Sequence, residues 1–256
     1  MKLIFVHGRA QGGKNPSELK KEWENSLLAG WDKIGKSRPE NLTIEFPFYG
    51  DELDKLVKSP QVPANTVVRT RDTPQTLENN DEQVFYYNWL AEMAADDPEI
   101  LSQVRERGGA QRRILDWAWV PRFLKKWDNT SFGNGVINAL LKDVYVYLNN
   151  TRIRSIIDEM VVKAFTEEPT VVVGHSLGSI VGYNVLRAGV PSSSLPLYVT
   201  LGSPLGIGVI REKLGAPLLM PPNVPKWYNA RDSRDIVALR PLDGETFSVT
   251  PPIINN

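Results

Sequence analysis

The sequence feature that most constrains the fold is a short apolar run that passes directly into a helix. Residues 170–173, Thr-Val-Val-Val, are apolar or β-branched without any alternation, as expected for a parallel strand that is buried on both faces. A helical pattern follows over 177–188 and ends at Gly189, the residue type favoured just past a helix end. A strand that leads into a helix in this way predicts a parallel α/β sheet.

A second strand and helix open the chain. Residues 3–6 form another unbroken apolar run, and a further strand is expected over 42–46. Between them, Asn15, Pro16 and Glu18 have the spacing of a helix start, with a capping residue, a proline at the first helical position and an acid three residues after the cap. This helix is expected to end near Gly30. The βαβ unit that results supports the parallel sheet, and strands are also expected over 197–201 and 226–229.

The middle of the chain has little strand character. From about residue 50 to 165 the pattern is helical, with helices expected over 81–95, 98–107, 112–126 and 136–165, the last broken near Asn149 and Asn150. The last of these precedes the strand at 170 and could belong with the sheet. We therefore expect an α/β core formed by residues 1–50 and 165–256, with residues 51–164 as a helical insertion or lid.

The composition excludes several kinds of chemistry. The chain has no cysteine and only 2 histidines among 256 residues, which excludes disulfides and thiolate metal sites. With 30 basic and 30 acidic residues, the balanced charge argues against a nucleic-acid partner. We expect no metal and no cofactor. Because no apolar stretch approaches about 20 residues and no signal peptide is recognisable, the expected location is the cytoplasm.

The turn between the apolar strand and the helix carries the clearest chemical signal. Residues 174–178, Gly-His-Ser-Leu-Gly, form a G-x-S-x-G motif in the strand-to-helix context that gives this motif its meaning. Such a turn projects the Ser176 hydroxyl above the sheet edge and directs the first N–H groups of the helix at a developing oxyanion. Ser176 is therefore the predicted nucleophile. The alternative is an ordinary turn that contains two glycines.

The loop after the first strand adds a family resemblance. Residues 6–10, Val-His-Gly-Arg-Ala, together with the later Gly-His-Ser-Leu-Gly motif, resemble the α/β-hydrolase superfamily. The resemblance implies an α/β-hydrolase fold, with a backbone N–H of Arg9 or Ala10 as an oxyanion donor beside that of Leu177. His7 is expected to hold the loop in place rather than to act as a base.

The same loop nearly fits a phosphate-binding motif. Residues 8–15 approach G-x-x-x-x-G-K-[ST], but the last position is Asn15, which lacks the hydroxyl that would bind magnesium. Pro16 also starts the helix later than a phosphate-binding loop would. Nucleotide binding is therefore disfavoured, and Lys14 is expected to be solvated.

An acidic residue follows the predicted strand at 226–229. Residues 202–204, Gly-Ser-Pro, and residues 229–237, Asn-Ala-Arg-Asp-Ser-Arg-Asp-Ile-Val, are similar to patterns of lipase-like serine hydrolases. By that similarity Asp235 is the carboxylate of a catalytic triad. Asp232 is the second candidate and is better suited to capping the loop. A simple surface-turn role for Asp235 stays open.

The histidine that the family places after this acid is missing. The only histidines are His7 and His175, and both precede Asp235. Neighbouring residues on a turn of this kind point apart, so His175 is not expected to reach Ser176. Three interpretations are open: the protein continues past Asn256, His7 acts as the base in an unusual geometry, or the fold is kept for binding alone.

Tryptophans and cations gather between residues 105 and 127. Such a segment could contact anionic lipid, an acyl chain or a protein partner, whereas aromatic stripes are more often core and charge runs more often solvated. The aromatic residues are Trp117, Trp119, Phe123 and Trp127, and the basic residues, set against Glu106 and Asp116, are Arg105, Arg107, Arg112, Arg113, Arg122, Lys125 and Lys126.

These features together predict a serine hydrolase of the esterase or lipase type. The expected substrate is a small hydrophobic or acyl-lipid carboxylic ester, cleaved through an acyl-enzyme on Ser176. The alternative is a catalytically impaired hydrolase-fold module that binds a partner, because no histidine follows Asp235.

Overall fold

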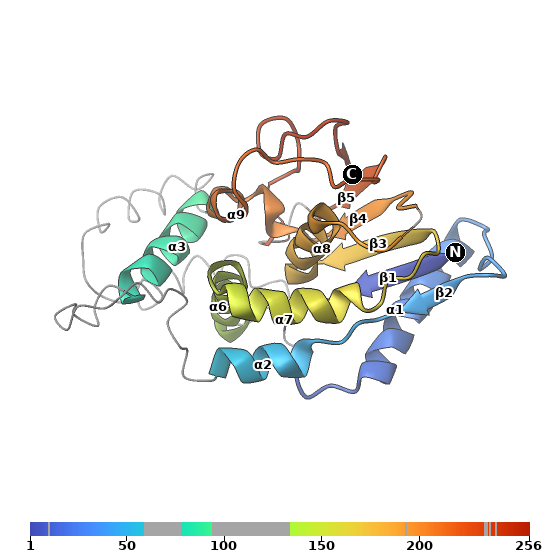
Figure 1. Ribbon diagram of the computed structural model, residues 1–256, viewed down its shortest axis with the longest axis horizontal. Coiled ribbons are helices and arrows are strands. Elements are labelled where there is room, and N and C mark those ends of the chain that lie inside the picture. The colour runs from blue at the N-terminus through green and yellow to red at the C-terminus, as the bar shows by residue number, and fades with distance from the viewer. Residues whose placement is uncertain are drawn as a thin grey trace.

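The computed structural model describes residues 1–9, 11–58, 78–93, 134–192, 194–232, 235, 237, 238 and 240–256. These residues form a six-stranded sheet in the order β2-β1-β3-β4-β5-β6, in which every neighbouring pair is parallel (Figure 1). The prediction of an α/β fold with a parallel sheet is therefore confirmed. The strands are β1 (Lys2–Val6), β2 (Thr43–Glu45), β3 (Thr170–His175), β4 (Tyr198–Leu201), β5 (Trp227–Ala230) and β6 (Ile254–Asn255).

Helices cover both faces of the sheet. On one face α1 packs with Leu3, Phe5 and Val173 in one apolar cluster. On the other face a larger cluster joins Ile4 and Val172 to helices α2, α3, α6, α7, α8 and α9. The helices are α1 (Pro16–Lys33), α2 (Gly50–Lys58), α3 (Glu78–Met93), α6 (Asn134–Asn149), α7 (Thr151–Val162), α8 (Leu177–Ala188) and α9 (Gly208–Leu214), with a 3-10 turn, η2, at Pro204–Gly206.

Helix α1 begins where its capping residues predict and ends later than expected. The side chain of Asn15 accepts hydrogen bonds from the backbone N–H groups of Ser17 and Glu18, at 2.9 and 3.3 Å. The helix continues past Gly30 to Lys33. The chain turns away from the helix axis at Gly35, two residues after this end, where a φ of +65° is allowed because glycine has no side chain.

The break predicted near Asn149 and Asn150 separates α6 from α7. Asn150 has extended backbone angles, and its side chain accepts a hydrogen bond from the N–H of Ile153, so it caps α7. Helix α7 packs on α8, and the described helices of the 51–164 segment share one apolar cluster with the sheet. The division into a core and a lid stays a prediction. The helices expected over 98–107 and 112–126 lie outside the described residues.

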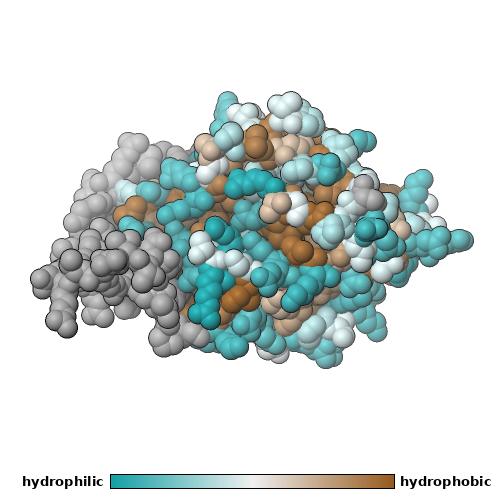
Figure 2. Space-filling model, in the orientation of Figure 1, coloured by the Kyte–Doolittle hydropathy of each residue, from teal (hydrophilic) through white to brown (hydrophobic). Residues whose placement is uncertain are grey.

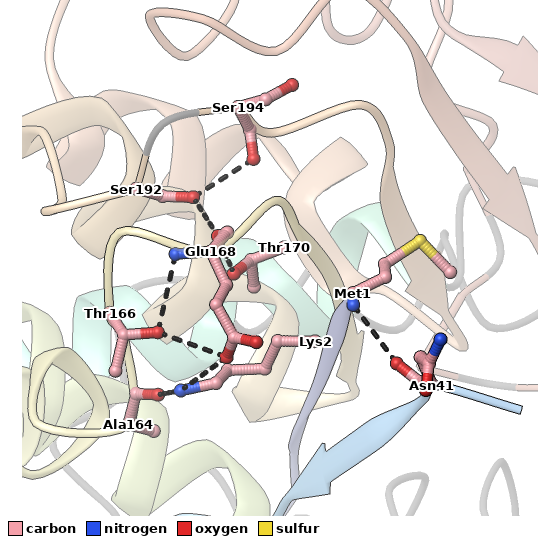
Figure 3. A network of polar contacts seen from close by, with 9 residues as sticks. All are labelled: Met1, Lys2, Asn41, Ala164, Thr166, Glu168, Thr170, Ser192 and Ser194. Atoms are coloured by element: carbon pink, nitrogen blue, oxygen red, sulfur yellow. Dashed lines mark hydrogen bonds and ion pairs between the residues drawn. The ribbon is translucent and has the colours of Figure 1, made fainter.

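The N-terminal ends of β1 and β3 are joined by a buried lysine. Lys2 is only 5% exposed, and its Nζ donates a hydrogen bond to the carbonyl oxygen of Ala164 at 3.0 Å and lies 3.9 Å from a carboxylate oxygen of Glu168 (Figure 3). The carbonyl oxygen of Glu168 in turn accepts a hydrogen bond from the hydroxyl of Thr170. This network holds β1 beside β3 at the end of the sheet opposite to Ser176.

The surface in the orientation of Figure 1 is mixed in character. Hydrophilic residues cover much of this face, and hydrophobic residues form separate patches between them (Figure 2). No helix in the described part of the chain is long and apolar enough to cross a membrane.

Candidate active site

The sheet has a switch point between β1 and β3. The chain passes from β1 to β2 on one side and from β3 to β4 on the other, although β1 and β3 are neighbours. In open α/β sheets, ligands bind in the crevice outside the carboxyl ends of the strands at such a point. The loop that starts at His7 follows β1, and Ser176 follows β3. The two segments singled out in the sequence therefore meet at this crevice.

Ser176 occupies a strained position between β3 and α8. Its φ of 52° and ψ of −124° lie in a region that residues with a side chain rarely adopt. Strain of this kind costs about 1–3 kcal/mol and tends to be kept at functional sites. The Ser176 side chain makes no capping hydrogen bond to the first turn of α8. Its hydroxyl is therefore not occupied in supporting the helix, and the residue is 8% exposed.

The two glycines of the motif are required by close backbone contacts. A methyl group on Gly178 would lie 2.1 Å from the carbonyl oxygen of Val6, and one on Gly174 would lie 2.7 Å from the carbonyl oxygen of Gly178. Both distances are far below van der Waals contact. Close packing therefore explains both glycines of the motif, because α8 crosses the end of β1 with no room for a side chain.

Two buried serines hold the kink in place. The Ser179 hydroxyl donates a hydrogen bond to the carbonyl oxygen of Ser176 at 2.6 Å, and the Ser203 hydroxyl lies 2.7 Å from that of Ser179. The hydroxyl of Tyr198 donates to the carbonyl oxygen of Ser179 at 2.6 Å. This role of Ser179 and Ser203 was not predicted. The only sign of it in the sequence is a second serine in the first turn of the helix.

His7 fastens the loop after β1, as expected. Its Nε2 accepts a hydrogen bond from the N–H of Tyr49 at 3.1 Å, so Nδ1 carries the proton and donates to the carbonyl oxygen of Gly8 at 2.6 Å. The ring is stacked on Tyr49 with centroids 4.0 Å apart. Burial lowers the pKa of His7 to about 4. The neutral ring, with both nitrogens engaged, acts as a structural group.

Arg9 ties the same loop to α6. Its Nε donates to a carboxylate oxygen of Asp143 at 2.9 Å. Burial raises the pKa of Asp143, and the hydrogen bond and charge of Arg9 oppose that shift. Ala10 lies outside the described residues. Leu177 is the first residue of α8, so its N–H belongs to the helix end that lacks partners within the helix. The oxyanion roles of Leu177, Arg9 and Ala10 stay predictions.

Asp235 follows β5 in the chain and is held by two local hydrogen bonds. Its N–H donates to the carbonyl oxygen of Asp232, and one carboxylate oxygen accepts from the N–H of Val237, both at 2.9 Å. Asp232 itself is exposed. The other carboxylate oxygen of Asp235 faces Gly202, where a methyl group would lie 2.9 Å from it and 3.6 Å from Nε2 of His175. Gly202, with a φ of +53°, thus separates the Asp235 carboxylate from the His175 ring.

The approach of His175 to Asp235 was not predicted. The ring lies at the end of β3, and Trp23 of α1 meets it edge-on with centroids 5.9 Å apart. By surface area His175 is an exposed residue. The protein packed around its ring nevertheless lowers the pKa of His175, because desolvation disfavours the charged form, and the charge of Asp235 offsets only part of this shift. The neutral ring is therefore the dominant form at neutral pH.

An apolar cavity of about 630 Å³ lies between α1 and strands β1, β3 and β4. His175 is at one end of it, so the cavity adjoins the turn that carries Ser176, although Ser176 does not line it. The lining residues are Met1, Leu3, Phe5, Trp23, Ser26, Leu27, Trp31, Leu42, Val171, Val173, His175, Leu197, Val199 and Leu201.

Within the described ranges, no three histidine, aspartate or glutamate side chains are grouped in a way that could hold a metal ion.

The chain matches no protein-family model, and neither a curated protein nor a solved structure is significantly similar to it. The aromatic and basic segment at 105–127 lies outside the described residues.

Proposed function

We propose that the protein is a serine hydrolase that cleaves a hydrophobic carboxylic ester through an acyl-enzyme on Ser176. The observation that carries the proposal is the backbone of Ser176, with a φ of 52° at the switch point of a parallel sheet. The proposed architecture is an α/β-hydrolase fold, with residues 51–164 as a helical lid over the site.

The proposed reaction uses the kink at Ser176. The Ser176 oxygen attacks the ester carbonyl, and the oxyanion that forms accepts hydrogen bonds from the backbone N–H of Leu177 and of Arg9 or Ala10. The positive end of the α8 dipole favours the same negative charge. Asp235 supplies the carboxylate that stabilises a protonated base. The tetrahedral intermediate then collapses, the bond to the alkoxide oxygen breaks and the alcohol leaves. Water hydrolyses the resulting acyl-enzyme, which releases the acid and regenerates the serine.

The cavity beside His175 supports an apolar substrate. Its volume of about 630 Å³ falls in the range typical of small-molecule sites. Apart from His175 and Ser26, the side chains around it are apolar. An alkyl or acyl group that extends from Ser176 past His175 would remove this surface from water.

Labelling with an alkyl fluorophosphonate tests the proposal. The full chain should form one covalent adduct, located at Ser176 by peptide mass spectrometry, and Ser176→Ala should abolish it. Ser17→Ala is the matched control, because Ser17 is an exposed serine near the start of α1 and its loss should leave labelling unchanged. An adduct that persists in Ser176→Ala would disprove the assignment of the nucleophile.

A partner-binding module is the other candidate function, and the same experiment separates the two. If the folded chain takes up no fluorophosphonate at all, the hydrolase proposal is wrong. The fold would then serve binding alone.

A further inference from the structure

A serine hydroxyl needs an adjacent base to act as a nucleophile. The sequence contains two histidines, and His7 is unsuitable because it is 1% exposed and hydrogen-bonded through both ring nitrogens. His175 differs in both respects. The residue is exposed by surface area, and among the described residues neither nitrogen of its ring has a hydrogen-bond partner.

We infer that His175 is the general base for Ser176 and that Asp235 positions its ring from the opposite side. The inference rests on the proposed serine-hydrolase function. It deepens that proposal by naming a base for Ser176.

Gly8 shows that the serine and one nitrogen of the imidazole lie on the same side of β3. A methyl group built on Gly8 would lie 3.1 Å from Cβ of Ser176 and 3.2 Å from Nδ1 of His175. Both atoms therefore converge above the end of β1. The sequence alone favoured side chains that point apart, but the kink at Ser176 turns its Cβ toward the space next to Nδ1.

Gly202 shows where the other nitrogen lies. A methyl group there would lie 3.6 Å from Nε2 of His175 and 2.9 Å from a carboxylate oxygen of Asp235. The ring thus lies between two small spaces: Nδ1 and Cβ of Ser176 border the one at Gly8, and Nε2 and the Asp235 carboxylate border the one at Gly202. No direct hydrogen bond joins the three side chains, and catalytic hydrogen bonds often shorten only when substrate is bound.

The proposed step is balanced as follows. The Ser176 oxygen forms a bond to the carbonyl carbon, its proton moves to Nδ1 of His175, and the carbonyl π electrons move to the oxyanion. The imidazolium, which keeps its proton on Nε2, faces the Asp235 carboxylate. The proton on Nδ1 then moves to the alkoxide oxygen as the bond between that oxygen and the carbonyl carbon breaks.

The first test compares fluorophosphonate labelling rates of the wild type and His175→Gly. Loss of a general base should slow labelling of Ser176 about 100-fold or more. Added imidazole should restore much of the rate in His175→Gly, because the cavity beside residue 175 is open, and should have no such effect on the wild type. A thermal melt of each protein separates this effect from misfolding, and His175→Asn provides a second variant of closer size.

The second test uses the pH profile of labelling. In the described part of the chain, Asp235 and His7 are the titratable groups whose charge interacts with that of His175. The Asp235 carboxylate raises the pKa of His175, so Asp235→Asn should move the midpoint of the profile to lower pH. A purely structural role for Asp235 would lower stability without moving that midpoint.

The outcomes separate this inference from the function on which it rests. If Ser176 is labelled equally fast in the wild type, His175→Gly and His175→Asn, the inference is wrong and the serine-hydrolase proposal stands. If the wild type is not labelled, both are wrong.

Discussion

The methyl group that Gly178 lacks would overlap the carbonyl oxygen of Val6. Gly178→Ala should therefore lower the free energy of unfolding by about 3 kcal/mol, because β1 and α8 would have to move apart. Gly30→Ala is the matched control. Gly30 lies inside α1 with no neighbour near the added atom, so alanine should raise stability by about 0.5–1 kcal/mol. Urea denaturation measures both, and equal effects would contradict the steric explanation.

Local pattern was enough to predict some residues of the site but not others. The role of Ser176 could be predicted because Gly174, Ser176 and Gly178 belong to one strand-to-helix turn, in which all the relevant residues are close in sequence. The proximity of His175 to Asp235 depends on β4 lying between β3 and β5, and on Gly202 leaving space between them. Strand order is not encoded in any single segment, so this proximity could not be predicted.

At the scale of elements, a hydrogen bond between buried Tyr147 and half-buried Asp158 joins α6 to α7. The hydroxyl of Tyr147 donates to a carboxylate oxygen of Asp158 at 2.6 Å, and burial raises the pKa of Asp158 to about 6. An unfolded aspartate titrates near pH 4. Between these two values the native state binds more protons than the unfolded state, so the stabilisation from this group is complete below about pH 4 and is lost as the pH rises through 6.

Asp158→Asn should remove this pH dependence. From pH 4 to pH 7, the unfolding free energy of the wild type should fall by about 1–2 kcal/mol relative to that of Asp158→Asn, the full shift being reduced because the carboxyl is partly exposed. Denaturation at several pH values measures the difference. Glu159→Gln, at an exposed carboxylate next in sequence, should track the wild type. If the unfolding free energy of Asp158→Asn fell between pH 4 and pH 7 as much as that of the wild type, the raised pKa of Asp158 would be contradicted.

Elements with strong end signals were predicted best. Asn15 and Asn150 cap α1 and α7 where the sequence suggests, and 177–188 matches α8. Helices α2 and α9 and the two-residue β6 were not predicted. Each is short, and its formation depends on contacts with distant segments, such as the packing of Leu53 of α2 in the main apolar cluster.

At the scale of the whole molecule, the free energy of local opening should be highest in the middle strands of the sheet and lowest in its edge strands. Strands β1, β3, β4 and β5 each have two neighbours, whereas β2 pairs over three residues and β6 over two, each on one side. Amide hydrogen exchange of the native protein should be slowest at Ile4 and Val172 and fastest at Thr43 and Ile254. Faster exchange in β3 than in β6 would contradict the strand order.

The pairing of β1 with β3 has a consequence for how the chain is made. Lys2 of β1 pairs with Thr170 of β3, so β1 leaves the ribosome long before β3, one of its two neighbours in the sheet, has been synthesised. At about 5–20 residues per second, that interval is on the order of ten seconds. During it, Leu3 and Phe5 have no β3 to pack beside. Until translation passes residue 175, the apolar side chains of β1 therefore lack their packing against β3, which exposes them to aggregation.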